Sequence, residues 1–203
     1  MFSMPPEEPL VVILGGINGA GKTTASEMLL GNKRSMPFVN TDAIARGLNA
    51  FAPERSAIQA GQIMLARLND LADKKASFAF ESTLSGRTYI SFLRRLQTEG
   101  YRVELCYFWL PSPEMSIERV RLRVKSGGHH IPAETIRRRH PKTMSNFWDD
   151  YRGLADHWMM FGNAGRWPEL TAFGSRQEKP TVIQPADFQL FQELIAYDSK
   201  PDN

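Results

Sequence analysis

A phosphate-binding loop constrains the fold of this chain more than any other feature. Residues 16–23 read Gly-Ile-Asn-Gly-Ala-Gly-Lys-Thr, which is the complete pattern G-x-x-x-x-G-K-[ST]. An apolar run at residues 10–14 precedes the pattern, and a helix-like run up to Leu30 follows it. The motif therefore has the strand–loop–helix context that it needs, and it predicts an α/β protein that binds a nucleoside triphosphate.

The loop also predicts individual contacts with the nucleotide. Its backbone N–H groups and the positive end of the following helix would face the phosphates. The Lys22 ammonium would reach the terminal phosphates, and the Thr23 hydroxyl would bind Mg²⁺. The residues expected to bind the nucleotide are Gly16, Asn18, Gly19, Ala20, Gly21, Lys22, Thr23 and Thr24.

Bulk composition indicates one soluble domain. The chain has 203 residues, of which 42% are hydrophobic and 23% charged. One cysteine, Cys106, excludes a disulfide framework and a cysteine-based zinc site. The start of the chain, residues 1–9, reads as neither a signal peptide nor a membrane anchor, so we expect a cytoplasmic protein. We expect a single domain over residues 1–203, with flexible ends at 1–8 and 199–203.

Strand-like and helix-like runs alternate along the chain. Strands are predicted at residues 10–14, 37–40, 77–81, 102–110, 158–161 and 170–173. Helices are predicted up to Leu30 and at residues 44–48, 53–71, 88–99, 113–124, 132–156 and 185–197. This alternation predicts a parallel sheet of the P-loop kinase type with helices on both faces. Ligands of such sheets bind beyond the carboxyl ends of the strands.

Two carboxylates end predicted strands and should lie at that edge. Asp42 closes the run 38–42, and Glu81 closes the run 78–81. Asp42 could accept a proton from an attacking hydroxyl, or it could only cap a helix beginning at Ala43. Glu81 could bind substrate or Mg²⁺, or it could make structural hydrogen bonds. No strand ends in four apolar residues followed by Asp, which favours a small kinase over a mechanical ATPase.

A basic segment follows the fourth predicted strand. Between Glu118 and Lys142 stand eight basic residues and two acidic ones, and the pair at 127–128 is Gly-Gly. This pattern predicts an arginine-rich lid with a glycine hinge, closing over the transferring phosphate. The arginines expected to contact phosphate are Arg121, Arg123 and Arg138, with at least one arginine of the segment being solvated surface. Nucleic-acid binding is the rival reading, and it is disfavoured because no aromatic side chains are interleaved with the charges.

Four motifs together resemble the zeta-toxin-like P-loop kinases, in their short stand-alone branch. They are GGINGAGKTT at 15–24, NTDAIAR at 40–46, FESTLSG at 80–86 and GGHHIPAETIRRR at 127–139. The similarity covers residues 10–165. It implies a kinase that phosphorylates a hydroxyl of UDP-N-acetylglucosamine and that an antitoxin protein restrains by blocking the ATP site.

The resemblance assigns roles position by position. Lys22 and Thr23 would hold ATP and Mg²⁺, and Asp42 would be the catalytic base. The same motif ends at Arg46, which would bind the substrate with Asp42, and the next motif supplies Glu81 and Thr83 to the sugar-nucleotide pocket. Arginines flanking the Gly-Gly pair would clamp the phosphate. Relatives often carry Asp-Asn-Ser where this chain has Phe-Gly-Asn-Ala-Gly at 161–165, and this departure leaves the contribution of that segment to nucleotide binding open.

The sequence leaves more than one function open. The first hypothesis is a Mg²⁺-ATP kinase acting on a hydroxyl of a small molecule, most often a nucleotide sugar in this family. An antibiotic or another metabolite could replace the nucleotide sugar as acceptor. A second hypothesis is an ATP-binding toxin or switch that acts through a protein partner. A third, minor hypothesis is nucleic-acid end processing.

Overall fold

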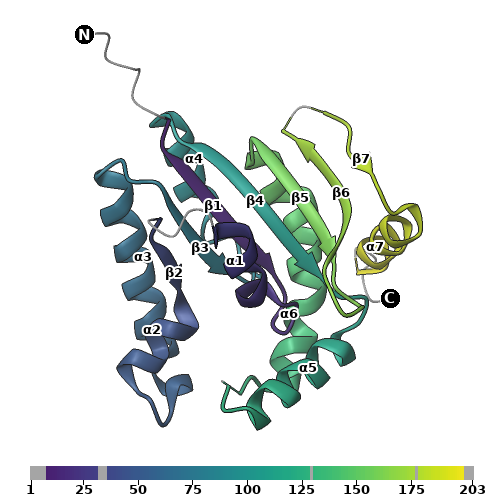
Figure 1. Cartoon of the computed structure of the whole chain (residues 1–203), viewed down its shortest axis with the longest axis horizontal. Helices are drawn as coiled ribbons and strands as arrows, with labels where there is room; N and C mark the ends of the chain where they lie inside the picture. The colour runs from purple at the N-terminus through teal and green to yellow at the C-terminus, as the bar shows by residue number, and fades with distance from the viewer. Residues whose placement is uncertain (1–7, 32–35, 129, 177, 199–203) are drawn as a thin grey trace.

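A seven-stranded sheet runs through the centre of the computed structural model, which describes residues 8–31, 36–128, 130–176 and 178–198 (Figure 1). The strands are β1 (Leu10–Gly16), β2 (Phe38–Asn40), β3 (Phe78–Ser82), β4 (Arg102–Trp109), β5 (His157–Gly162), β6 (Glu169–Ser175) and β7 (Thr181–Val182). The segments predicted to be flexible, 1–8 and 199–203, lie outside the described residues except for Glu8.

Helices connect most of the strands. They are α1 (Lys22–Leu30), α2 (Thr41–Leu48), α3 (Ala57–Asp73), α4 (Ile90–Thr98), α5 (Pro113–Lys125), α6 (Ala133–Asn146) and α7 (Pro185–Asp198). Short helical turns add η2 (Pro53–Ser56), η3 (Phe147–Tyr151) and η4 (Arg152–Leu154). The predicted helix over residues 132–156 is thus divided: α6 passes into a π-helical turn, η3, and then into a 3₁₀ turn, η4.

The strand order is β2-β3-β1-β4-β5-β6-β7. β2, β3, β1, β4 and β5 pair in parallel, as the alternation of strands and helices predicts. β6 pairs antiparallel with β5 on one side and with β7 on the other, so this edge of the sheet is mixed. The reason is the short β5–β6 connection at residues 163–168, since a parallel return needs a crossover of a dozen or more residues.

Both faces of the central strands are buried, which explains their nearly continuous apolar sequence. Along β1, Val11 and Ile13 pack into one cluster with α3, α4 and α7, whereas Val12 and Leu14 pack into another with α1 and α5. Helices therefore cover both faces, as predicted (Figure 1). α6 contributes to both clusters and so spans the two faces.

The cluster beneath α3 gives a stability prediction. Leu68 of α3 has no exposed surface, whereas Leu122 of α5 is 51% exposed. Leu68→Ala should lower the free energy of unfolding by about 2–5 kcal/mol, because it removes buried methyl groups and leaves a cavity. Leu122→Ala, the matched control, should change it by no more than about 0.5 kcal/mol. Urea denaturation measures both values, and equal losses in the two variants would contradict this packing.

Candidate functional site

The P-loop lies between the carboxyl end of β1 and the first turn of α1, as the motif predicts. Gly16 has a φ of 136°, and a Cβ added there would lie 2.0 Å from the carbonyl oxygen of Phe108. Gly21 has a φ of 86° and immediately precedes α1. Both positions therefore require glycine, one through close approach to β4 and the other through the left-handed turn that opens the helix.

Asn163 supports the loop from the carboxyl end of β5. Its Nδ2 donates a hydrogen bond of 2.8 Å to the carbonyl oxygen of Ala20, and its side chain is 7% exposed. A Cβ on Gly21 would approach the same Nδ2 to 2.6 Å. The contribution of the segment 161–165, which the sequence left open, therefore includes a buried hydrogen bond from Asn163 that supports the P-loop.

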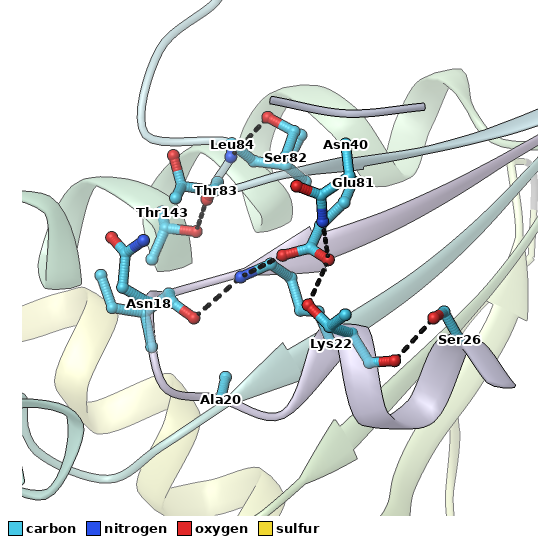
Figure 2. Close-up of polar contacts among 12 residues, drawn as sticks. Asn18, Ala20, Lys22, Ser26, Asn40, Glu81, Ser82, Thr83, Leu84 and Thr143 are labelled. Carbon is cyan, nitrogen blue, oxygen red and sulfur yellow. Dashed lines mark hydrogen bonds and ion pairs between the residues drawn. The ribbon is translucent and has the colours of Figure 1, made fainter. Parts of the chain in front are cut away.

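Lys22 points into the site as a buried cation. Its Nζ donates to the Ile17 carbonyl oxygen at 3.0 Å and lies 3.5 Å from Oε1 of Glu81 (Figure 2). Burial lowers the pKa of Lys22, while the carboxylates of Glu81 and Asp42 oppose that shift and Arg123 adds to it. The ammonium therefore faces two carboxylates in a poorly solvated position next to the P-loop.

Glu81 joins the P-loop to β2. Its Oε2 accepts hydrogen bonds from Oγ1 of Thr23 at 2.7 Å and from Nδ2 of Asn40 at 2.9 Å (Figure 2). The parallel register that pairs Leu14 with Glu81 and Asn40 with Glu81 brings these groups together. The structure therefore links two predicted site residues, Thr23 and Glu81, directly.

Asn40 is also the N-cap residue of α2. Its Oδ1 accepts a hydrogen bond of 3.1 Å from the backbone N–H of Ala43, so Asn40 caps the helix. The capping role that the sequence left open for Asp42 therefore belongs to Asn40. Asp42 lies in the first turn of α2 and lines a cavity beside Lys22.

That cavity, which we name the acceptor cavity after the role proposed for it, has a volume of about 640 Å³ and opens at the carboxyl ends of the strands. Five of the predicted site residues outside the basic segment line it: Asn18, Lys22, Asp42, Glu81 and Thr83. From α6 and the segment before it come His130, Ile131, Pro132, Thr135, Arg138, Arg139 and Lys142.

The predicted lid arginines do not all reach this cavity. Arg138 lines it, together with Arg139, whose Nη1 donates to Oδ1 of Asn18 at 3.3 Å. Arg121 does not: it is exposed and makes a bidentate ion pair with Glu118 one turn earlier on α5, at 2.9 and 3.0 Å. Arg121 thus fits the solvated-surface role that the sequence reserved for at least one arginine.

Two further predicted residues lie at the margin of the site. Arg123 is partly buried, packs against Gly128, and is close enough to Lys22 to lower its pKa. Arg46 is exposed in the last turn of α2 and does not line the acceptor cavity.

A second cavity of about 290 Å³ lies on the other side of the P-loop. Its lining includes Thr24, a predicted nucleotide contact, and Arg119, whose Nη2 donates to the carbonyl oxygen of Gly165 at 3.2 Å. Trp167 and Met28 also line it and are 66% and 70% exposed. The P-loop therefore separates two cavities.

Four residues of the site were not predicted from the sequence: Asn40, Arg139, Lys142 and Asn163. For Asn40 and Asn163 a signal was present, because both stand at the carboxyl end of a strand, the same criterion that selected Asp42 and Glu81. Arg139 and Lys142 were part of the basic segment, but only the orientation of α6 shows that they line the cavity.

Comparison with known sequences decides the family. A profile of the family described as "Zeta toxin" matches residues 2–165. The chain belongs to the zeta toxin family. An uncharacterised protein of Haemophilus influenzae is 31% identical over 126 residues, which are 62% of this chain and 88% of that protein. Membership of this family supports an ATP-dependent kinase.

Solved structures agree with this zeta toxin fold. A chain of the AvrRxo1-ORF1:AvrRxo1-ORF2 complex with sulphate ions has a TM-score of 0.74 at 16% identity; 97% of this chain is covered, and 66% of that chain. The same complex with ATP has a TM-score of 0.72 at 18% identity, over 97% of this chain and 66% of that one. A chain of the PezAT toxin–antitoxin system of Streptococcus pneumoniae has a TM-score of 0.64 at 17% identity. The match covers 98% of this chain and 82% of that chain. This chain is therefore shorter than all three.

Two further observations concern metals and membranes. Within the described ranges, no three His, Cys, Asp or Glu side chains are grouped so that they could hold a metal ion. Among the helices of the described residues, none has the length and apolar character needed to cross a membrane.

The hydrogen bond from Asn163 to the P-loop leads to a prediction about ATP binding. Asn163→Ala should raise the dissociation constant of Mg²⁺-ATP by roughly tenfold, because the Ala20 carbonyl loses a buried donor and the loop loses its support. Isothermal titration calorimetry measures the constant. Asn69→Ala, which changes an exposed asparagine on α3, serves as the control. An unchanged dissociation constant for Asn163→Ala would contradict the buttressing role.

Proposed function

We propose that this zeta toxin family chain transfers the γ-phosphoryl group of ATP to a hydroxyl of a small molecule, with a nucleotide sugar such as UDP-N-acetylglucosamine as the best-supported acceptor. One observation carries the proposal. The P-loop lysine, Lys22, shares one cavity with the carboxylate of Asp42 and with Arg138 and Arg139 of α6. A general base, a phosphate-binding cation and charge-neutralising guanidinium groups are the parts that phosphoryl transfer requires.

ATP would lie across the P-loop, between the two cavities. Its phosphates would meet the backbone N–H groups of residues 19–22 and the amino end of α1. The second cavity would take the nucleoside, because it combines the exposed ring of Trp167 with Thr24 and Arg119 on the outer side of the loop. This places the γ-phosphate toward Lys22 and the acceptor cavity.

Mg²⁺ fits the oxygen donors beside the P-loop. Oγ1 of Thr23 and the Glu81 carboxylate lie 2.7 Å apart, and hard oxygen ligands from one or two side chains are what Mg²⁺ uses when phosphates complete its shell. Thr23 would bind the ion directly, and Glu81 would bind it or its water. When bound, the ion neutralises charge on the β- and γ-phosphate oxygens.

In the transfer step, the acceptor hydroxyl oxygen attacks the γ-phosphorus. The bond from that phosphorus to the bridging oxygen of ADP breaks, and the hydroxyl proton goes to the Asp42 carboxylate. Lys22, Arg138 and Arg139 offset the negative charge on the transferring group and on ADP. The products are ADP and a phosphomonoester of the acceptor.

The lining of the acceptor cavity suits a nucleotide sugar. Hydroxyl groups of Ser82, Thr83 and Ser85 line one wall, and such groups donate to and accept from sugar hydroxyls. Another part of the lining comes from α6, which presents Arg138 and Lys142, and these suit the diphosphate of the acceptor. Because ATP and nucleotide sugars are cytoplasmic metabolites, the proposal places the enzyme in the cytoplasm.

An antitoxin partner forms part of the proposal. One similar structure is described as a toxin–antitoxin system, and the rim of the second cavity exposes Met28 and Trp167. A protein that covered these side chains would block the nucleoside cavity. Such restraint differs from the rival hypothesis, in which a protein partner itself is the target. The rival predicts ATP turnover that depends on a protein and not on a small hydroxylic acceptor.

Replacing Asp42 should affect phosphoryl transfer and leave ATP binding intact. Asp42→Asn should lower kcat at least about a hundredfold, because the amide cannot accept the hydroxyl proton, while the affinity for Mg²⁺-ATP stays within about twofold. Lys22→Ala should instead weaken ATP binding. ADP release with a panel of nucleotide sugars, nucleosides and alcohol-bearing antibiotics measures turnover. Undiminished turnover in Asp42→Asn would refute its role as base.

The arginines allow a matched comparison on neighbouring helices. Arg138→Ala should lower kcat/KM for the acceptor at least about tenfold, because a guanidinium group facing the transferring phosphate is lost. Arg121→Ala should leave kcat/KM within about twofold, since Arg121 pairs with Glu118 at the surface. The same turnover assay measures both. Equal losses would show that α5 also contributes to the site.

A further inference from the structure

The segment after β3 forms one wall of the acceptor cavity. We call residues 82–88 the acceptor loop; Ser82, Thr83, Ser85, Gly86 and Thr88 of this loop line the cavity. Within the loop, the backbone N–H of Leu84 donates to Oγ of Ser82 at 3.1 Å, and at its far end Nε of Arg87 donates to Oδ2 of Asp150 in η3 at 2.8 Å. Leu84 has a φ of 54°, a left-handed conformation that a leucine adopts only when its surroundings impose it.

Side chains of α6 and η3 hold the backbone on both sides of Leu84. Oγ1 of Thr143 donates to the carbonyl oxygen of Thr83 (Figure 2). Nδ2 of Asn146 donates to the carbonyl oxygen of Leu84 at 2.8 Å, and the Tyr151 hydroxyl donates to that of Gly86 at 2.7 Å. Three of the four consecutive carbonyls at residues 83–86 therefore accept a hydrogen bond from one helical segment.

The π-helical turn η3 explains how one segment reaches all three carbonyls. In an uninterrupted α-helix, Tyr151 would point about 80° away from Thr143 around the helix axis. A π turn takes up roughly one extra residue, which brings Tyr151 back toward the direction of Thr143. Burial raises the pKa of Tyr151 to about 12, so its hydroxyl keeps the proton that it donates.

The same helix forms the basic wall of the cavity. Arg138, Arg139 and Lys142 of α6 line it, and Lys142 immediately precedes Thr143, the first donor to the acceptor loop. The helix α6 therefore sets the distance between its own basic side chains and the hydroxyl groups of the acceptor loop. Thr143 is itself held from the core, because the buried hydroxyl of Tyr107 donates to its Oγ1 at 3.3 Å.

We propose that Thr143, Asn146 and Tyr151 are positioning residues that set acceptor specificity. They hold the backbone of the acceptor loop in place. The hydroxyl groups of Ser82, Thr83 and Ser85 then face a substrate whose anionic part binds to the basic side chains of α6. The proposal rests on the proposed function in taking the 640 Å³ cavity as the acceptor site. None of the three side chains has to touch the acceptor or ATP for this role.

Two variants test it without removing a large side chain from the core. Tyr151→Phe deletes only the hydroxyl, and Asn146→Ala deletes the amide of a partly buried side chain. Gln97→Ala is the matched control, because Nε2 of Gln97 donates to the carbonyl oxygen of Leu154 at 2.7 Å, a bond of the same kind that does not reach the acceptor loop. For position 143, Thr143→Ser keeps the donor and Thr143→Val removes it.

The first readout needs no acceptor. Hydrogen–deuterium exchange should become faster in peptides covering residues 82–89 in Asn146→Ala and Tyr151→Phe, and it should stay unchanged there in Gln97→Ala. Exchange in the P-loop peptide should stay unchanged in all three variants. Unaltered exchange in the 82–89 peptides of both test variants would overturn the proposal.

The second readout is steady-state kinetics with Mg²⁺-ATP and UDP-N-acetylglucosamine. Each test variant should raise the KM for the sugar nucleotide roughly three- to tenfold, the loss expected for one hydrogen bond, with kcat and the KM for ATP within about twofold. Thr143→Ser should retain the wild-type KM and Thr143→Val should not. A parallel fall in kcat and rise in both KM values would overturn the positioning role. If wild type does not turn over UDP-N-acetylglucosamine, the proposed acceptor fails, and the exchange result alone decides about positioning.

Discussion

The carboxylate of Glu81 is the group on which the rest of the site depends. Lys22 is a buried ammonium, and a buried charge is tolerated only where opposite charge and hydrogen bonds compensate for lost hydration. Glu81 provides that charge while it accepts hydrogen bonds from Thr23 and Asn40. Asn40 in turn caps α2, the helix that carries Asp42. One carboxylate thereby connects the lysine and the threonine of the P-loop with the helix that carries the proposed base.

The sheet makes this arrangement possible. β2 and β1 flank β3, so the residues at their carboxyl ends converge on Glu81 without any long-range loop. α6 closes the cavity from the other side and also orders the loop that follows β3. The site is therefore built from strand ends on one side and one helix on the other, and both belong to the rigid part of the fold.

The sequence predicted the architecture because its signals are local. The P-loop pattern, the apolar strands and the helix limits depend on neighbouring residues, and they gave the nucleotide-binding loop, the parallel strands and the helices on both faces. The antiparallel direction of β6 was not predicted, since direction depends on how short the connection after β5 is, and the two-residue strand β7 was not predicted at all. The long predicted helix at 132–156 passes through a π turn, which no periodicity in the sequence announces.

The side chains of the site were predictable only where a strand end fixed them. Asp42 and Glu81 followed from that rule, and Asn40 and Asn163 satisfy it equally. Arginines of the basic segment could not be ranked from the sequence, because helical spacing tells which residues share a face but not what that face meets. The structure turns Arg138 and Arg139 toward the cavity and leaves Arg121 paired with Glu118. Roles of all these residues in catalysis stay predictions.

The most direct test of the central claim is the mass of the product formed when the wild-type protein is incubated with Mg²⁺-ATP and UDP-N-acetylglucosamine. The account predicts ADP and a sugar nucleotide that is heavier by one phosphoryl group, formed in equal amounts. ATP binding without phosphorylation of this acceptor or of any other small hydroxyl compound would contradict it.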